Sequence, residues 1–165
     1  MDLRNLPADS EVFIDTNIFL YAISDHPRYG AACNELLERV KTEEIKGRIS
    51  VIVLNELLHK LMLGEIAEKE NIKLSQVIRS IRNNREILKD LKAYGIIGDI
   101  ETNYNLSITS VNQDDFDEAR KLMKKEFLLS NDALHLAVMK REEIVNLATR
   151  DSDFAAVEDI EIWEP

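Results

Sequence analysis

Two short apolar runs, each ending at or beside an acidic residue, constrain the fold of this chain more than any other feature. The first is Glu11–Asp15 (EVFID), and the second is residues 145–149 (VNLAT), which lie just before Asp151. Runs of this kind are typical of strands that are buried on both faces of a parallel sheet. Because such a sheet needs helices on both faces, the two runs predict an α/β fold.

Amphipathic segments and short β-rich runs alternate along the rest of the chain. After a helical turn at 18–22, we expect helices at about 29–46, 54–62, 74–94, 116–127 and 132–139, and strands at 48–51, 106–108 and 160–163. Gly47 is expected to end the first of these helices, and the polar stretch 95–105, with two glycines, to be a loop. No repeat or linker interrupts the pattern. We therefore predict one domain over residues 1–165, with a three-layer α/β/α architecture and a mostly parallel central sheet.

Four acidic residues lie where this fold would bring them together. Asp15 and Asp151 follow predicted strands, Glu56 follows the second strand within a few residues, and Asp132 opens a helix. Ligands of open parallel sheets bind beyond the carboxyl ends of the strands, and helices on this fold begin at the same edge. The four carboxylates are therefore expected to converge on one rim of the sheet.

Converging carboxylates imply a bound cation. Carboxylates a few ångströms apart repel one another, so at least one pKa would be raised unless a positive charge lay between them. Mg²⁺ and Mn²⁺ take oxygen ligands and suit phosphodiester hydrolysis, because they activate water and offset charge on the phosphate. Each acid alone has a simpler interpretation, since Asp commonly caps helices and follows strands. The shared edge is what favours a metal site.

Composition narrows the class of protein further. The net charge of −10 argues against a general phosphate-gripping surface, although acids gathered at a metal site count as negative in this sum. Cys33 is the only cysteine, so no internal disulfide can form. No apolar run has the roughly 20 residues needed to cross a bilayer, and residues 1–7 lack the pattern of a signal peptide. We expect a cytoplasmic protein that does not enter membranes.

Four motifs, in order, resemble those of the PIN-domain nucleases, and in particular the VapC-type toxin ribonucleases of prokaryotes. The motifs are Phe13-Ile14-Asp15-Thr16-Asn17, Asn55-Glu56-Leu57, Asn131-Asp132-Ala133-Leu134-His135-Leu136-Ala137 and Ala148-Thr149-Arg150-Asp151-Ser152-Asp153-Phe154. The resemblance covers nearly the whole chain. It implies a PIN-like, Rossmann-like sheet flanked by helices, Mg²⁺ or Mn²⁺ held by the acids, and endonucleolytic cleavage of RNA. It also implies a homodimer and, for the toxins, a small antitoxin partner.

The resemblance also implies a role for each matching residue. Asp15 and Asp132 would bind the metal directly, and Glu56 and Asp151 would complete the site, directly or through water. Asp153 is a fifth candidate ligand at the periphery. Thr16, Asn17 and Thr149 would orient water or phosphate. One departure is the segment at about 64–112, an enlarged helical region that is longer than in a compact toxin of this type.

That longer segment carries five basic residues: Arg79, Arg82, Arg85, Lys89 and Lys92. On one continuous helix they would fall within about 140° of one another, opposite the apolar face. Such a basic stripe could hold an RNA backbone beside the acidic site. The alternative is an ordinary solvated helix face with pairs such as Glu86 and Lys89.

Other functions stay open at this point. Glu56-x-x-His59 and Asp132-x-x-His135 have the spacing of di-iron helix bundles. The strands before Asp15 and Asp151 argue against a bundle, and we expect both histidines to lie packed on half-buried helix faces. A phosphoryl-accepting receiver domain would need a strand-ending Lys, which is absent. A catalytically silent PIN-fold module that binds RNA or protein, or an RNA-processing nuclease unrelated to toxins, remains the alternative to a toxin ribonuclease.

Overall fold

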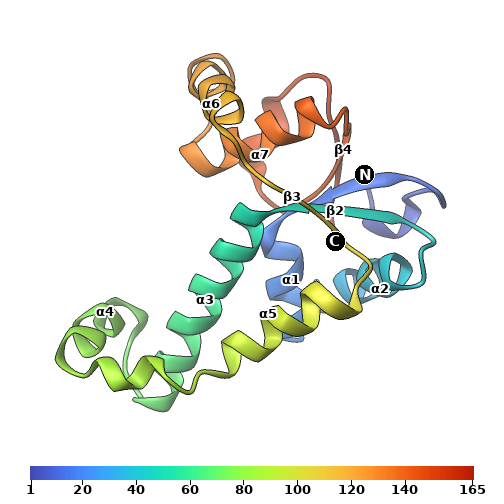
Figure 1. Ribbon diagram of the computed structural model, residues 1–165. Coiled ribbons are helices and arrows are strands. Elements are labelled where there is room, and N and C mark those ends of the chain that lie inside the picture. Colours follow the sequence, from blue (N-terminus) through green and yellow to red (C-terminus); the bar gives the residue numbers. More distant parts are fainter.

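Five parallel strands form the centre of the computed structural model, which describes residues 1–165. The strands are β1 (Glu11–Ile14), β2 (Lys46–Ser50), β3 (Ser107–Thr109), β4 (Asn146–Ala148) and β5 (Glu161–Trp163). Their order across the sheet is β3-β2-β1-β4-β5 (Figure 1). The parallel sheet that the two apolar runs predicted is therefore confirmed, and both runs lie at its centre.

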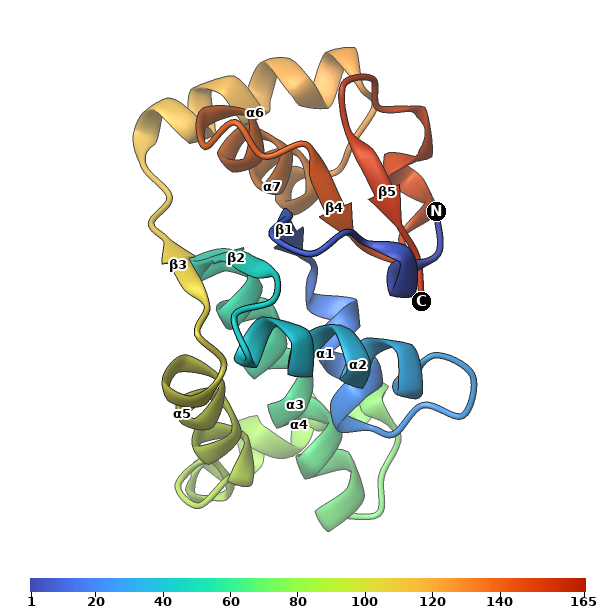
Figure 2. The same cartoon turned by 90° about the vertical axis from the view of Figure 1, so that its right-hand side faces the viewer.

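Seven α-helices complete the fold, and their layers can be followed in Figures 1 and 2. They are α1 (Thr16–Ile23), α2 (Gly30–Lys41), α3 (Val51–Lys69), α4 (Leu74–Asn83), α5 (Lys92–Asn103), α6 (Gln113–Lys125) and α7 (Ser130–Arg141), and short 3₁₀ helices lie at η1 (Leu3–Asn5), η2 (Arg85–Leu88) and η3 (Ser152–Ala156). Helices α6 and α7 lie on one face of the sheet, and α1, α2, α3 and α5 lie on the other (Figures 1 and 2). The predicted three-layer α/β/α class is confirmed.

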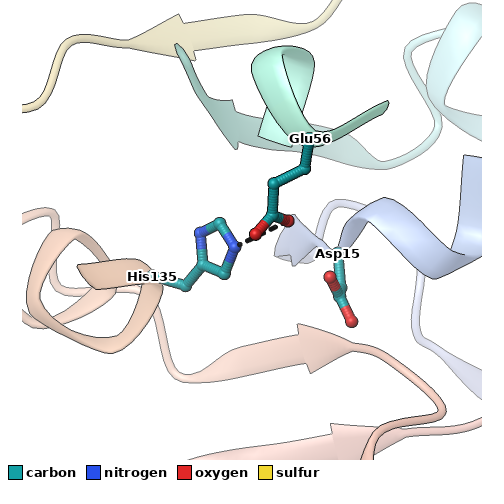
Figure 3. A group of neighbouring side chains, drawn as sticks. All are labelled: Asp15, Glu56 and His135. Atoms are coloured by element: carbon teal, nitrogen blue, oxygen red, sulfur yellow. Dashed lines mark ion pairs between the residues drawn. The ribbon is translucent and has the colours of Figure 1, made fainter. Parts of the chain in front are cut away.

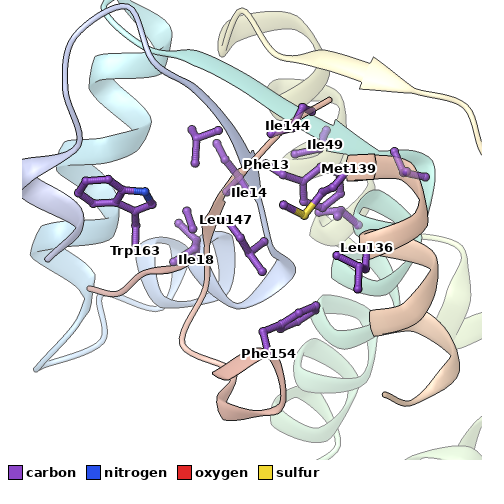
Figure 4. Close-up of a cluster of buried hydrophobic side chains, with 14 of the residues drawn as sticks. Phe13, Ile14, Ile18, Ile49, Leu136, Met139, Ile144, Leu147, Phe154 and Trp163 are labelled. Atoms are coloured by element: carbon purple, nitrogen blue, oxygen red, sulfur yellow. The ribbon is translucent and has the colours of Figure 1, made fainter. Parts of the chain in front are cut away.

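The hydrophobic core is continuous through the sheet. The side chains of Phe13 and Ile14 on β1 are fully buried, as is Leu147 on β4 (Figure 4). Leu136 and Met139 of α7 close one face of this core. Burial of a large aliphatic side chain stabilises a fold by about 1.5–3 kcal/mol, so the central strands are held in place by their neighbours on both faces.

The chain reverses its direction across the sheet at β1. From β1 it proceeds outward through β2 and β3, then returns to the other side of β1 as β4 and continues to β5. Asp15 and the residues that follow β4 therefore lie at the point where the strand order switches. Open α/β sheets form a crevice there, because the connections leave the carboxyl ends in opposite directions.

The segment 64–112 differs from the sequence prediction in two ways. Residues 74–94 do not form one helix: α4 ends at Asn83, Asn84 has an extended backbone (φ −143°, ψ 96°), and the η2 turn follows. The predicted loop at 95–105 is instead mostly the helix α5. A Cβ added at Gly95 or Gly98 would meet nothing within 4 Å, so both glycines lie on open parts of α5.

A second, smaller hydrophobic cluster holds this segment to the distal half of α3. Ile66 of α3 and Val77 of α4 are fully buried, together with Leu91 and Ala93 at the start of α5. Helix α4 thereby lies at the end of α3 that points away from the sheet (Figure 1). This part of the segment therefore lies at the distal end of α3 rather than at the strand ends.

Element boundaries near Gly47 were also predicted wrongly. The helix α2 ends at Lys41, and Gly47 lies within β2 rather than after the helix. A Cβ at Gly47 would come within 2.6 Å of Val40 Cγ1 and 2.7 Å of Leu106 Cδ2. The glycine is thus required by the close packing of β2 beneath α2. None of the helices combines the length and the apolar character that a bilayer crossing demands.

Candidate active site

The four predicted acids line one hollow at the carboxyl ends of β1 and β4. The hollow has a volume of about 330 Å³. Asp15 comes from the end of β1, Glu56 from α3, Asp132 from α7 and Asp151 from the turn after β4. The rest of the lining is Asn17, Tyr21, Lys60, Arg150 and Ser152. Segments more than a hundred residues apart thus meet at the carboxyl edge of the sheet, where their places after strands and at a helix start predicted them to meet.

Asp15 is the most enclosed of these acids, at 8% exposure. The Thr149 hydroxyl donates a hydrogen bond of 2.6 Å to its Oδ2, and the Asn17 amide donates to the same oxygen. Asn17 Nδ2 also lies 3.0 Å from Thr149 Oγ1. Two of the predicted supporting residues therefore fix the Asp15 carboxylate, and its other oxygen takes no part in these bonds.

Glu56 lies in the second turn of α3 and is half-buried. The hydroxyl of Thr16 donates a hydrogen bond of 2.7 Å to Oε2, and the Asn131 amide donates to Oε1. Burial by itself raises the pKa of this carboxyl, but the neighbouring His135 ring and the hydrogen bonds from Thr16 and Asn131 lower the pKa to about 2. Asn131 therefore anchors Glu56.

His135 joins this group from the opposite layer. Its Nε2 lies 3.5 Å from Glu56 Oε2, and ligand atoms of Asp15, Glu56 and His135 all lie within 4.8 Å of one another (Figure 3). The side chain is 2% exposed, its ring packs against Phe13, and neither ring nitrogen has a hydrogen-bond partner. The sequence prediction that both histidines lie on half-buried faces is wrong, because His135 is buried and His59 is exposed.

A second group of acids borders the same hollow. Carboxylate oxygens of Asp132, Asp151 and Asp153 lie within 4.8 Å of one another. Asp151 caps η3, since its Oδ1 accepts a 2.9 Å hydrogen bond from the backbone N–H of Asp153. Thr149 Oγ1 accepts from the backbone N–H of Asp151 at 3.0 Å, so the same threonine connects both groups.

Burial and neighbouring charges both shift the pKa values of these acids. Burial, followed by the nearby charge of Asp151, raises the pKa of Asp132 to about 6, and Asp15 and Glu56 add to this effect. Burial also raises the pKa of Asp15, although the Thr149 hydrogen bond opposes the rise. A carboxyl with a raised pKa among other carboxylates is an arrangement that a divalent cation would stabilise.

The donor set fits a hard divalent ion. Carboxylate oxygens supply all three donors of one group and two of the three donors of the other, and Mg²⁺ and Mn²⁺ favour such ligands. The single nitrogen donor, His135, lies in an enclosed position with both ring nitrogens unpaired. Buried polar atoms are nearly always satisfied in native proteins, so these nitrogens point to a partner supplied by the site.

None of the five residues of the predicted basic stripe lines this hollow. Arg79 and Arg82 belong to α4, Arg85 to η2, and Lys92 to the start of α5, so no single helix carries them. All five residues of the stripe are exposed, and Lys89 forms an ion pair with Glu86. Two other cationic side chains, Lys60 and Arg150, line the hollow instead. Lys60 follows Glu56 by one helical turn, a spacing that could have identified it.

A parallel sheet that gathers carboxylates at its topological switch point defines a class: α/β proteins with an oxygen-rich centre suited to a divalent cation. Residues 12–160 match the PIN domain model, and the chain belongs to the PIN domain family. The membership expected from the four motifs is therefore confirmed.

Two curated relatives extend along almost the whole chain, and both come from Methanocaldococcus jannaschii. Ribonuclease VapC2 is 28% identical over 160 residues, covering 94% of this chain and 95% of the relative. Ribonuclease VapC6 is 30% identical over 163 residues, covering 93% and 96%. Because coverage is nearly complete in both directions, the segment 64–112 lies within a length that these relatives share.

Solved structures agree on the fold. Mycobacterium tuberculosis VapC20, described as a toxin that cleaves the sarcin-ricin loop, superposes with a TM-score of 0.61 at 18% identity, over 88% of this chain and 93% of that one. VapBC2 from Rickettsia felis, bound to a DNA fragment from its promoter, gives 0.57 at 21% identity, over 93% and 98%. At these identities the likeness establishes the shared fold.

Proposed function

We propose that this protein is a metal-dependent endoribonuclease that hydrolyses RNA phosphodiester bonds. The observation that carries the proposal is the meeting of Asp15, Glu56, Asp132 and Asp151 in one hollow at the switch point of the sheet. The names of the two archaeal relatives, both ribonucleases, support the same activity. The complete set of acids disfavours the alternative of a catalytically silent module.

Mg²⁺ or Mn²⁺ is the cofactor that this donor set would hold. Asp15 from one group and Asp132 from the other would be its main ligands, with Glu56 beside Asp15, and Asp151 and the exposed Asp153 beside Asp132, completing the site. When bound, such an ion activates water and offsets negative charge on the phosphate. The chain itself supplies the rigid framework that keeps these oxygens in place.

The surrounding residues position that framework. Thr149 and Asn17 hold Asp15, while Thr16 of α1 and Asn131 and His135 of α7 hold Glu56. Because its pKa lies near 2, Glu56 stays ionised at neutral pH. Lys60 and Arg150 contribute positive charge at the rim, where a phosphodiester would approach the acids.

The biological role that we propose is that of a toxin, neutralised by a small antitoxin protein and acting as a homodimer. The VapC names of the relatives and the toxin–antitoxin complexes among the structural neighbours support it. An RNA-processing role is the competing assignment. Growth arrest upon expression, relieved by a short protein encoded in the neighbouring reading frame, would support the toxin role; unaffected growth would favour processing. Light scattering would measure the proposed dimer.

The activity is tested by incubating the protein with single-stranded RNA in Mn²⁺, in Mg²⁺ and in EDTA. We expect cleavage with either metal, none in EDTA, and none by Asp15→Asn. Asp117→Asn is the matched control, because Asp117 is an exposed acid on α6 outside the hollow. An inactive native protein, or equal cleavage by Asp15→Asn, would overturn the proposal.

A further inference from the structure

One wall of the acidic hollow continues into a cluster of aromatic rings and arginines that the metal site does not use. We call it the ring cluster, and its members are Tyr21, His26, Arg28, Tyr29 and Arg150. Tyr21 and Arg150 also line the hollow, so the ring cluster begins at the candidate active site itself. The other three come from the connection between α1 and α2.

The members of the ring cluster stack on one another. The rings of His26 and Tyr29 are nearly parallel, with centroids 4.8 Å apart and planes 9° apart. Tyr21 lies 4.9 Å from His26 and 5.1 Å from Tyr29, tilted against both. The guanidinium of Arg28 lies 5.2 Å from the Tyr29 centroid, and that of Arg150 lies 5.8 Å from it.

Backbone contacts hold the ring cluster in this arrangement. His26 Nδ1 accepts hydrogen bonds from the backbone N–H groups of Arg28 and Tyr29, at 3.3 and 3.2 Å. Gly30 closes the turn tightly, since a Cβ there would lie 3.0 Å from the carbonyl carbon of Asp25. The rings are therefore ordered before any ligand arrives, which lowers the entropy that binding would cost.

Burial separates the ring cluster from ordinary core packing. Phe13, Phe19 and Phe154 are fully enclosed, whereas Tyr21, His26 and Tyr29 are each only half-buried and Arg28 is exposed. Grouped aromatic and guanidinium surfaces that stay partly exposed are the features on which single-stranded RNA bases stack. The two arginines also add positive charge to a chain with a net charge of −10, although Arg150 forms an ion pair with Glu164 at 3.2 Å.

We propose that the ring cluster is a nucleobase-binding subsite, which stacks an unpaired base of the RNA strand whose phosphate enters the acidic hollow. The inference rests on the proposed ribonuclease function and adds a requirement for single-stranded substrate at this position. Stacking is tolerant of base identity because every base presents a π face. The ring cluster thus positions the strand, while the acids act on its phosphate.

The experiment pairs changes in the protein with removal of bases from the RNA. Binding of a short single-stranded oligoribonucleotide is measured by fluorescence anisotropy in the Asp15→Asn background with Mn²⁺, so that cleavage does not interfere. A series of the same RNA carries one abasic nucleotide at successive positions. We expect one position whose abasic form binds about tenfold more weakly, and we expect Tyr29→Leu to abolish most of that difference.

Matched variants separate stacking from a general loss of structure. Tyr29→Phe keeps the ring and should preserve the abasic penalty, and Phe116→Leu removes an exposed aromatic of α6 without affecting it. Arg28→Leu changes an exposed member of the ring cluster and should reduce the penalty even if Tyr29→Leu folds poorly. Thermal melting confirms that each variant is folded.

Two results would overturn the inference, and they are distinct from failure of the ribonuclease function. If no position shows an abasic penalty, or if the penalty is equal in Tyr29→Leu and Arg28→Leu, the rings only stiffen the connection between α1 and α2. The native protein would still cleave RNA in that case. An absence of metal-dependent cleavage would instead remove the proposed function, and the subsite with it.

Discussion

His135 Nε2 on α7 and Glu56 Oε2 on α3 lie 3.5 Å apart, and this contact joins helices from opposite layers of the sheet. The histidine is almost fully buried, and its neighbour is an acid of the candidate metal site. Residues that orient metal ligands commonly matter almost as much as the ligands themselves. The contact therefore identifies His135 as a positioning residue for Glu56.

Replacing His135 by Phe should weaken the binding of the metal ion but leave the protein folded. The Phe ring keeps the packing against Phe13 but removes both nitrogens, so Glu56 loses one of its anchors. We expect the Mn²⁺ concentration for half-maximal cleavage to rise about 10- to 100-fold. His135→Gln retains an amide donor and should recover part of the loss. An unchanged Mn²⁺ dependence in both variants would assign His135 to the core alone.

The sequence revealed the acids but not this histidine. Asp15 and Asp151 could be placed because a strand end fixes which edge of a parallel sheet a residue occupies. His135 lies within the run Ala133–Met139, which is buried at every position, so helical periodicity offered no direction for its side chain. Its function became visible only through the atoms that surround it.

Asp151 and Asp153 should contribute unequally to the rate of RNA cleavage. Asp151 is half-buried and lines the hollow, whereas Asp153 is exposed and contacts Asp151 through its backbone. We expect Asp151→Asn to reduce cleavage by about a hundredfold or more, and Asp153→Asn by less than about tenfold. Initial rates at saturating Mn²⁺ provide the measurement. Comparable losses in the two variants would show that Asp153 is a full ligand.

The segment 64–112 was the part of the fold that the sequence described least well. Asn84 adopts an extended backbone and its side chain accepts a hydrogen bond from Glu86 N–H, which ends α4 and starts η2. The pair of glycines in α5 resembled a loop, but packing of α5 against α3 outweighs their low helix propensity. Tertiary contacts of this kind cannot be derived from local spacing.

Cations near the hollow should affect RNA binding more than those on α4. Lys60 lines the hollow, whereas Arg82 lies on the helix farthest from the sheet (Figure 1). We expect Lys60→Ala to weaken RNA affinity roughly threefold at low salt, and less at high salt, because salt screens exposed charges. Arg82→Ala should have a smaller effect in the same titration. If Arg82→Ala weakened RNA affinity more than Lys60→Ala did, the basic stripe rather than the hollow would be the RNA contact.

Gly47→Ala should destabilise the protein without touching the site. The added methyl would come within 3 Å of Val40 and Leu106, so α2 or the segment before β3 must shift. Overpacking of this kind costs about 1–3 kcal/mol. Chemical denaturation measures the change, and Gly64→Ala is the control because open space surrounds Gly64. If Gly47→Ala were as stable as the native protein, the side chains of Val40 and Leu106 would be able to move aside without cost.

The stability of the metal-free protein should fall as pH rises from about 4.5 to about 6.5. Burial and the charge of Asp151 raise the pKa of folded Asp132 to about 6 from 3.8, so the folded state holds this proton more tightly than the unfolded chain. That contribution is complete below the unfolded pKa and is lost as pH rises through the folded pKa. The lowered pKa of Glu56 affects stability only at lower pH, since the folded pKa of about 2 lies below its ordinary value of 4.5. Asp15, whose pKa burial raises, adds in the same direction as Asp132.

Thermal melts in EDTA across this range measure the effect. A loss of up to about 2 kcal/mol corresponds to a decrease in Tm of roughly 4–8 °C. Asp132→Asn should flatten the profile, because the neutral amide has no proton to lose. Excess Mn²⁺ should reverse the slope, since metal binding requires ionised carboxylates and stabilises the folded state that holds it. If the stability profiles in EDTA and in Mn²⁺ run parallel, no metal ion occupies this group of acids.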